Sequence, residues 1–343
     1  MDSITQAVLG GTIAVVVTRG EKPRKAVMWG AIIATLPDLD ILIQYDNPLD
    51  RIVAHRTWTH SWLMHTAITP VLATLLHRTV GQWSAGTWWL LVWLALVTHS
   101  GIDACTVFGT DLFWPIAQST VIGGSVFIID PAYTLFLLFA CIFALTRPLS
   151  KKLWSFSVFA LMFSSAYLAW GLIAKTMIHS QAVNDLAKQG IKTEQVLVQA
   201  SPFNSLLWRI LVIDGESYYE GYHSVLDSAD SEITVKQYSR KYSLLAGLEN
   251  SKSVKQLEHF NHGYFSVKQD GSSIVVSDLR MGAEPAYNFQ FKIAEKDKTG
   301  TRLTTPKMMP RPGIPDGLFY KMWQRIFDKN VKMDFHFLSG NHK

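Results

Sequence analysis

The sequence has few of the features that mark common soluble protein classes. It holds only two cysteines in 343 residues, Cys105 and Cys141, and neither lies in a Cys-x-x-Cys pattern. A thiolate metal site or a disulfide framework is therefore not expected. No basic tract is present and the formal net charge is only +5, which argues against a nucleic-acid partner. The chain begins Met1-Asp2-Ser3, without the positive region of a cleaved signal peptide.

Long uncharged runs are present instead, and nearly all of them lie within residues 1–178. The run 154–174 holds 21 residues, enough to cross a hydrocarbon core of ~30 Å. The runs 4–18 and 26–36 are short for a span, but acceptable inside a bundle. We therefore expect residues 1–178 to form a polytopic α-helical membrane domain of about six segments. These are the runs 4–18, 26–36, 61–76, 87–102, 132–146 and 154–174.

Positive charge is unevenly distributed among the loops between these segments. Lysines and arginines of short loops stay on the cytoplasmic side of a membrane. The odd-numbered loops are basic, and the even-numbered loops are rich in aspartate and histidine. We expect the basic loops in the cytoplasm and the acidic loops in the periplasm of a bacterial inner membrane, with the C-terminal domain on the periplasmic side. The basic residues are Arg19, Lys22, Arg24, Lys25, Arg78, Arg147, Lys151 and Lys152.

Residues 179–343 have the rhythm of a soluble α+β domain. Strands are expected at 208–226, 231–239 and 286–296, and a hairpin at 263–280 with Asp270-Gly271 as its turn. Helical spacing is present at 243–260 and 316–330. Asp278 and Arg280, with Glu284 beyond them, are expected to form a structural ion pair at a strand end; the alternative is that this domain is a lid that shapes substrate access.

Three elements bring carboxylates and imidazoles to the expected periplasmic face. One pair of aspartates follows the second segment, two histidines precede the third, and the fourth ends with a histidine and an aspartate four residues apart, which share a helix face. Zn²⁺, and to a lesser degree Mn²⁺ or Fe²⁺, takes such nitrogen and oxygen ligands where no thiolate is offered. We therefore expect a divalent metal site, with zinc first and one or two ions. The expected ligands are Asp38, Asp40, His55, His60, His99 and Asp103.

Each part of this constellation has a simpler interpretation. The Asp-x-Asp pair can be a helix stop with solvated carboxylates, the loop histidines can bind lipid headgroups, and His99 with Asp103 can be a buried ion pair. Their common location favours the metal site. Three further candidates lie nearby: Asp111 as a general base, His65 as a supporting or core histidine, and Asp130 in the next loop of that side.

Several of these stretches resemble a known family. The segments MDSITQAVLGGTIA, GAIIATLPDLDIL, HRTWTHS, HSGIDACTVFGTDLFWP and FIIDPAYTL are similar to the YdjM-like inner-membrane metal-dependent hydrolases. SPFNSLLWRILV, YYEGYHSVLD and DLRMGAEPAY resemble the long-form members. The resemblance implies a membrane-bound metal-dependent hydrolase without an assigned substrate. The spacing of His99 and Asp103 is also similar to a short motif of zinc-dependent phospholipase C and related nucleases.

We therefore expect a hydrolase at the outer face of the inner membrane, with a membrane lipid or lipid-linked phosphoester as substrate. The rival expectation is a metal-ion or proton carrier that uses the same cluster, although carriers place such groups near the bilayer midplane and show paired halves. A third possibility is a non-enzymatic membrane anchor for a periplasmic binding domain, which leaves the ligand cluster unexplained. The sequence does not indicate an oligomeric state.

Overall fold

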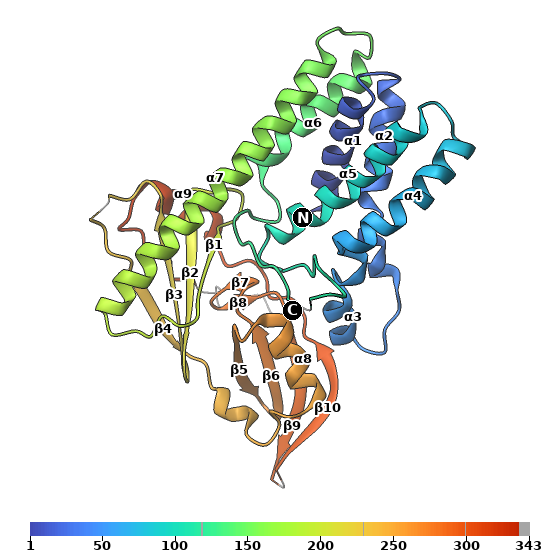
Figure 1. The fold of residues 1–343 in the computed structure, drawn as a ribbon. Coiled ribbons are helices and arrows are strands. Elements are labelled where there is room, and N and C mark those ends of the chain that lie inside the picture. Colours follow the sequence, from blue (N-terminus) through green and yellow to red (C-terminus); the bar gives the residue numbers. More distant parts are fainter. Residues whose placement is uncertain (118, 229, 299, 336–343) are drawn as a thin grey trace. The chain divides into compact units, whose positions relative to one another are not determined.

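The computed structural model describes residues 1–117, 119–228, 230–298 and 300–335. A helical N-terminal region is followed by a sheet-rich C-terminal domain (Figure 1). The chain divides into two compact units. Unit 1 comprises Met1–Ile43, His55–Ile173 and Pro202–Asn204, and unit 2 comprises Gln44–Ala54, Ala174–Ser201 and Ser205–Lys343.

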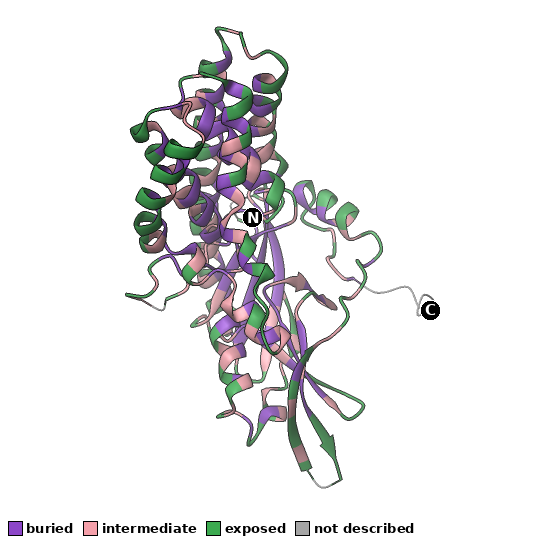
Figure 2. Cartoon of the chain, turned by 90° about the vertical axis from the view of Figure 1, so that its right-hand side faces the viewer, coloured by how far each residue is buried: buried purple, intermediate pink, exposed green. Residues whose placement is uncertain are grey.

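Unit 1 is helical, and each of the six expected uncharged runs lies within one α-helix, to within one residue at its ends. Figure 2 shows exposed residues on the outside of these helices and buried residues between them. Two 3₁₀-helices, η1 (Pro37–Leu42) and η2 (Trp58–His60), lie in the connections. The α-helices are α1 (Ser3–Val17), α2 (Pro23–Thr35), α4 (Trp62–Thr79), α5 (Ala85–Ala104), α6 (Pro131–Thr146) and the first part of α7 (Leu153–Lys188).

Two of these helices, α5 and α7, are long and apolar enough to cross a membrane by length and composition. They have 20 and 36 residues. Helices α1 and α6 are also apolar, but they are shorter, with 15 and 16 residues. Within the described residues, the expected six crossings are therefore supported for two helices, and the count of six stays a prediction.

Glycines allow α1 and α2 to pack closely. A Cβ atom on Gly30 would lie 2.1 Å from the carbonyl oxygen of Gly10, and one on Gly10 would lie 2.3 Å from the carbonyl oxygen of Gly30. Small residues at a helix crossing permit this approach of two backbones. The contact fixes the C-terminal end of α2, which carries Ala34 and leads directly into η1.

Unit 2 contains two four-stranded antiparallel sheets, with strand orders β1-β2-β3-β4 and β10-β9-β6-β5. The end of α7 packs on the first sheet, where Trp208, Ile210 and Val212 are fully buried. Alternate residues of a strand point to one face, which explains why these three share it. The strands are β1 (Val196–Ala200), β2 (Leu207–Asp214), β3 (Ser217–Ser224), β4 (Val235–Ser239), β5 (Phe265–Asp270), β6 (Ser273–Asp278), β9 (Gln290–Asp297), β10 (Gly300–Met308) and the short pair β7 (Gly282–Ala283) and β8 (Ala286–Tyr287).

The structure confirms the hairpin expected at 263–280. Asp270 pairs with Ser273 across the turn, and Gly271 has a φ of 57°, which a glycine adopts without strain. The stretch 316–330 contains α9 (Leu318–Phe327). The stretch 243–260 is not one helix: Gly247, with a φ of 81°, separates η3 (Tyr242–Leu245) from α8 (Lys252–Asn261).

The expected ion pair at the end of β6 is present and buried. Arg280 Nη2 lies 2.7 Å from Asp278 Oδ2, and the two side chains are 0% and 2% exposed. Glu284 is not part of this pair, because it accepts a hydrogen bond from Tyr218 at 2.7 Å. The pair therefore has a structural role at the strand end.

Helix α3 (Pro48–Ala54) belongs to unit 2, although its sequence lies between two helices of unit 1. It packs against α8 and β10, and Leu49 is fully buried while Ile52 is 9% exposed. No sequence pattern indicated this assignment, because residues 44–54 lie between two expected membrane segments.

Candidate metal centre

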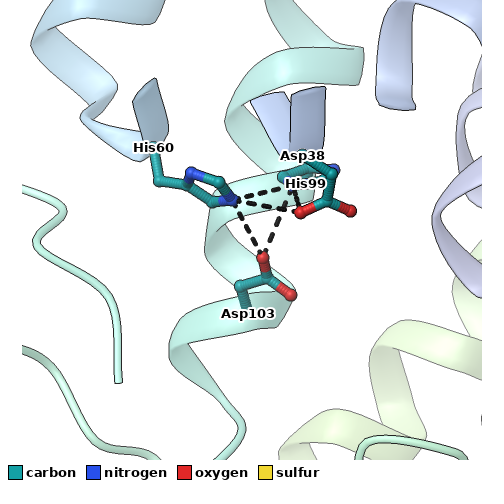
Figure 3. Close-up of side chains that lie close together, drawn as sticks. All are labelled: Asp38, His60, His99 and Asp103. Atoms are coloured by element: carbon teal, nitrogen blue, oxygen red, sulfur yellow. Dashed lines mark hydrogen bonds and ion pairs between the residues drawn. The ribbon is translucent and has the colours of Figure 1, made fainter. Parts of the chain in front are cut away.

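Four side chains from three elements converge in unit 1 and are called the His/Asp cluster below (Figure 3). Asp38 lies on η1, His60 is the last residue of η2, and His99 and Asp103 lie one turn apart on α5. One ligand atom from each lies within 4.8 Å of the others. The side chains of His60, His99 and Asp103 are 0% exposed, and that of Asp38 is 20% exposed.

Local sequence explains how Asp38 and His60 reach this position. Pro37 has no N–H group, so α2 cannot continue through it and the chain tightens into η1. After η2, the Ser61 hydroxyl caps α4 by accepting from the Met64 N–H, and it donates to the Trp114 carbonyl at 2.5 Å. These contacts hold the short connections that present Asp38 and His60.

The two imidazole Nε2 atoms lie at similar distances from each other and from both carboxylates. His60 Nε2 lies 3.2 Å from His99 Nε2, 3.5 Å from Asp38 Oδ1 and 3.3 Å from Asp103 Oδ2. His99 Nε2 lies 3.6 Å from Asp38 Oδ1 and 3.4 Å from Asp103 Oδ2. The two imidazoles thus face each other and both carboxylates.

The outer nitrogen of each imidazole is engaged, which indicates where its proton lies. His99 Nδ1 lies 2.6 Å from the Ala34 carbonyl oxygen, and a carbonyl only accepts, so this nitrogen carries the hydrogen. The Thr59 hydroxyl donates to Asp40 Oδ2 at 2.7 Å, so it can accept from His60 Nδ1 at 3.0 Å.

In the neutral rings, both Nε2 atoms therefore direct lone pairs into the cluster. They meet two carboxylate oxygens there, so four electron-pair donors point at one another. Donors this close repel each other unless a cation or an additional proton lies among them. The arrangement could therefore hold a metal ion.

Asp103 uses its two oxygens differently. Oδ1 accepts from Gln6 Nε2 at 3.1 Å, lies 3.3 Å from Arg56 Nη2 and binds the amino group of Met1. Oδ2 faces the imidazoles and, among the described residues, accepts no hydrogen bond although it is buried. A buried oxygen without a donor is costly, and a bound cation would satisfy it. The residues present therefore fit a metal ion.

Charge on the loop carboxylates also suits a cation. Burial alone would raise the pKa of Asp38, but when the imidazoles carry the additional proton, their hydrogen bonds to Asp38 outweigh burial and hold this pKa well below its ordinary value. Burial likewise opposes ionisation of Asp40, and the hydrogen bond with His55 lowers the pKa of Asp40. Both groups are carboxylates at neutral pH.

Asp40 and His55, two of the six expected ligands, lie beside the cluster and contact each other. His55 Nδ1 lies 2.7 Å from Asp40 Oδ1. Asp40 Oδ2 accepts from the Thr59 hydroxyl and lies 3.7 Å from His60 Nδ1. The structure therefore brings four of the expected ligands together. The pair of Asp40 and His55 lies on the Nδ1 side of His60, away from the other three cluster residues.

His65 and Asp111 also lie outside the cluster. His65 is buried on α4, and its Nε2 donates to the Thr59 carbonyl at 2.8 Å, which supports η2. Asp111 accepts from the Thr120 hydroxyl at 2.6 Å, and its N–H donates to the Arg56 carbonyl at 3.0 Å. Asp111 is thus connected to the cluster through Arg56, whose side chain contacts Asp103.

Asp130 caps a helix. Its Oδ1 accepts from the N–H groups of Ala132 and Tyr133 at the start of α6, and its Oδ2 accepts from the Tyr167 hydroxyl at 2.8 Å. These contacts account for both oxygens of the carboxylate.

Three residues around the cluster were not expected from the sequence: Gln6, Arg56 and Thr59. Thr59 and Arg56 lie within HRTWTHS and Gln6 lies within MDSITQ, so the family-like segments contained all three. Neutral polar residues and a lone arginine carry no metal-ligand signal of their own, and only the fold shows what they contact.

These features define a class: a helical protein with two helices long and apolar enough to cross a membrane and a buried His/Asp cluster that could hold a metal ion. The family model described as YdjM inner membrane protein matches residues 1–178, and the chain belongs to that family. This confirms the resemblance to the YdjM inner-membrane family over residues 1–178 and places the protein in the inner membrane.

A curated relative supports the same location. The Inner membrane protein YbcI of Escherichia coli (strain K12) is 29% identical over 93 residues, which is 27% of this chain and 53% of that protein. The chain thus spans about half the length of this relative. No solved structure matches the chain.

Proposed function

We propose that this protein is a metal-dependent hydrolase of the inner membrane that acts at the periplasmic face on a lipid-linked phosphoester. The observation that carries the proposal is the convergence of His60, His99, Asp38 and Asp103, with both Nε2 atoms and Asp103 Oδ2, which accepts no hydrogen bond among the described residues, directed to one point. A purely structural ion pair does not require two imidazole lone pairs to face each other.

The spacing of the donors supports zinc. A tetrahedral ion with bonds of ~2.0–2.2 Å has donor atoms ~3.3–3.6 Å apart. The five separations that involve an imidazole nitrogen run from 3.2 to 3.6 Å, and the Asp38 and Asp103 oxygens lie within 4.8 Å of each other. Octahedral Mg²⁺, with bonds of ~2.0–2.1 Å and oxygen ligands, would need neighbouring donors ~2.8–3.0 Å apart. Within the described part of the chain there is one such group, so a single ion is proposed.

The chain's own residues would divide the work of hydrolysis. A bound zinc would supply Lewis-acid chemistry, polarising a phosphoryl oxygen and lowering the pKa of water. Asp38 has the most exposed side chain of the four, so substrate would approach from its side. Asp111 remains the proposed general base, held by Thr120. Four protein ligands fill a tetrahedral shell, so turnover also requires Asp38 to yield its place or a fifth position to open.

The surroundings of Asp38 support a lipid substrate. Leu39, Ile41 and Leu42 of η1 are 52%, 58% and 72% exposed. An apolar ridge beside a polar cluster suits a molecule with an acyl chain and a charged headgroup. The basic loops support the periplasmic orientation of this end of the helices.

The helix-end location favours this function over a carrier. Asp38 and His60 lie on 3₁₀-helices between α-helices, and His99 and Asp103 lie in the last two turns of α5. A carrier would place its ionisable groups near the middle of its spanning helices.

The proposal is tested on the purified full-length chain in detergent. Wild type should hold about one zinc per chain, His60→Ala with His99→Ala should hold almost none, and the control His77→Ala, which changes an exposed histidine of α4, should match wild type. Hydrolysis is measured with lipid phosphoesters in liposomes. The hydrolase proposal would be overturned by any of three results: wild type without zinc, wild type with zinc but without turnover, or metal flux across sealed vesicles.

A further inference from the structure

The acidic side chain of α3 is held on both of its oxygens. Asp50 Oδ1 accepts from Gln256 Nε2 of α8 at 2.7 Å, and Asp50 Oδ2 accepts from Asn47 Nδ2 at 2.7 Å. The adjacent Leu49 is fully buried. Lys252 also approaches Asp50, but at 3.8 Å and with a side chain that is 78% exposed. Helix α3 is therefore fixed to α8 by a specific, partly buried hydrogen bond.

In sequence, this helix lies between the two segments that carry Asp38 and His60 of the His/Asp cluster. Residues 44–54 join η1, which carries Asp38, to His55, the residue that directly follows α3. The contact between His55 and Asp40 closes a loop around α3. The Thr59 hydroxyl contacts both Asp40 Oδ2 and His60 Nδ1. Residues 44–54 are thus connected to the His60 imidazole through covalent chain and three short contacts.

We infer that Asp50 and Gln256 are positioning residues for the metal centre: by docking α3 on α8, they hold the loop between Asp40 and His55 in its closed form before metal binds. An undocked α3 would leave this loop flexible, and its closure would then cost chain entropy upon each binding event. Ligands held in place in advance bind more tightly than ligands that must be ordered. The inference rests on the proposed metal function and extends it, because it makes the affinity of a unit 1 site depend on α8 of unit 2.

The test first breaks the hydrogen bond between Asp50 and Gln256 and then restores it with donor and acceptor exchanged. Gln256→Glu places two carboxylates against each other and should lower the affinity for Zn²⁺ by about tenfold, the effect expected of a group that supports a ligand. Asp50→Asn added to Gln256→Glu lets the new amide donate to the new carboxylate while its oxygen still accepts from Asn47. This double variant should regain wild-type affinity. Lys252→Ala is the control and should leave affinity unchanged.

Affinity is measured by competition with a zinc-binding dye on the full-length chain, with thermal unfolding followed in parallel. If Gln256→Glu does not fold, Gln256→Ala replaces it and should show the same direction of change. Wild type without zinc affinity would end the proposed metal function itself. Wild type that binds zinc, with equal affinity in Gln256→Glu or no recovery in the double variant, would overturn this inference alone.

Discussion

Replacing Asp38 by asparagine removes one charge from the His/Asp cluster at nearly constant side-chain volume. Asp38 Oδ1 lies 3.5 Å and 3.6 Å from the Nε2 atoms of His60 and His99. Both rings direct lone pairs toward it, and an asparagine amide can rotate so that its NH₂ group donates to them. The substitution thus removes a ligand and also satisfies the metal-free cluster, so metal affinity should fall while metal-free stability is kept.

The size of the effect follows from the position of Asp38 in the cluster. Groups that only support a ligand cost ~10–100-fold in affinity, so the loss of a ligand should cost at least ~100-fold. At a zinc concentration about 100 times the wild-type Kd, binding stabilises the fold by ~2.7 kcal/mol. A Kd raised ~100-fold lowers this stabilisation to ~0.4 kcal/mol at the same concentration. The zinc-induced rise in Tm should therefore nearly disappear.

The assay is thermal unfolding of the detergent-solubilised chain with and without zinc. The control, Asp46→Asn, makes the same chemical change at an exposed position of the loop that follows η1 and should keep the full zinc-induced rise. A rise in Asp38→Asn equal to that of wild type would show that Asp38 is not a ligand. If Asp38→Asn lost much of its stability without metal, the argument that its amide rotates to donate to the two imidazoles would be wrong.

Three further outcomes are expected. Thr59→Val removes the hydroxyl that orients the metal-facing imidazole of η2 and should weaken zinc binding by about tenfold in the dye competition, with Thr59→Ser restoring it. Gly30→Ala forces α1 and α2 apart and should destabilise unit 1 by ~1–3 kcal/mol, seen as a lower Tm, whereas Gly86→Ala in α5, with no atom closer than 3.9 Å to its Cβ, should not; equal melting of the two would refute the close-packing argument. Burial opposes ionisation of Asp227, but the hydrogen bond from Arg325 outweighs it and lowers the pKa of Asp227 below its ordinary ~3.9. A carboxylate whose pKa is lowered by folding stabilises the fold at pH values above its unfolded-state pKa, and this stabilisation is lost as the pH falls through its folded-state pKa. The Tm of wild type should therefore drop more steeply below pH ~4 than that of Asp227→Asn, and parallel curves of Tm against pH would exclude this contribution.

The helices and one hairpin could be predicted from the sequence because their signals are local. An uncharged run is a property of consecutive residues, and Asp270-Gly271 specifies its own turn. The helical spacing at 243–260 failed to reveal the break at Gly247, since a pattern of apolar residues does not report a left-handed backbone angle. Whether each short helix crosses the membrane also depends on lipid and packing, which local hydropathy does not contain.

The site was predictable only to the level of which residues share one end of the helices. Charge distribution and helix period place Asp38, Asp40, His55 and His60 on the same side as α5's His-x-x-x-Asp, but they cannot say which member of each loop pair points inward. In a 3₁₀-helix, a shift of two residues turns a side chain by about two thirds of a turn. That choice depends on tertiary contacts, such as the hydrogen bond from the Thr59 hydroxyl to Asp40.

The donor set of the cluster has a consequence for the stresses that the protein meets. All four donors are nitrogen or oxygen, and the two cysteines, Cys105 and Cys141, are not members of the cluster. Oxidants that disable thiolate centres in an oxidising compartment have no target among these ligands. Nitrogen and oxygen sites do, however, bind Cu²⁺ more tightly than Zn²⁺, and only a tetrahedral arrangement opposes the planar geometry that copper prefers. For a centre of this composition, replacement of the metal by copper is the chemical hazard, and oxidation is not.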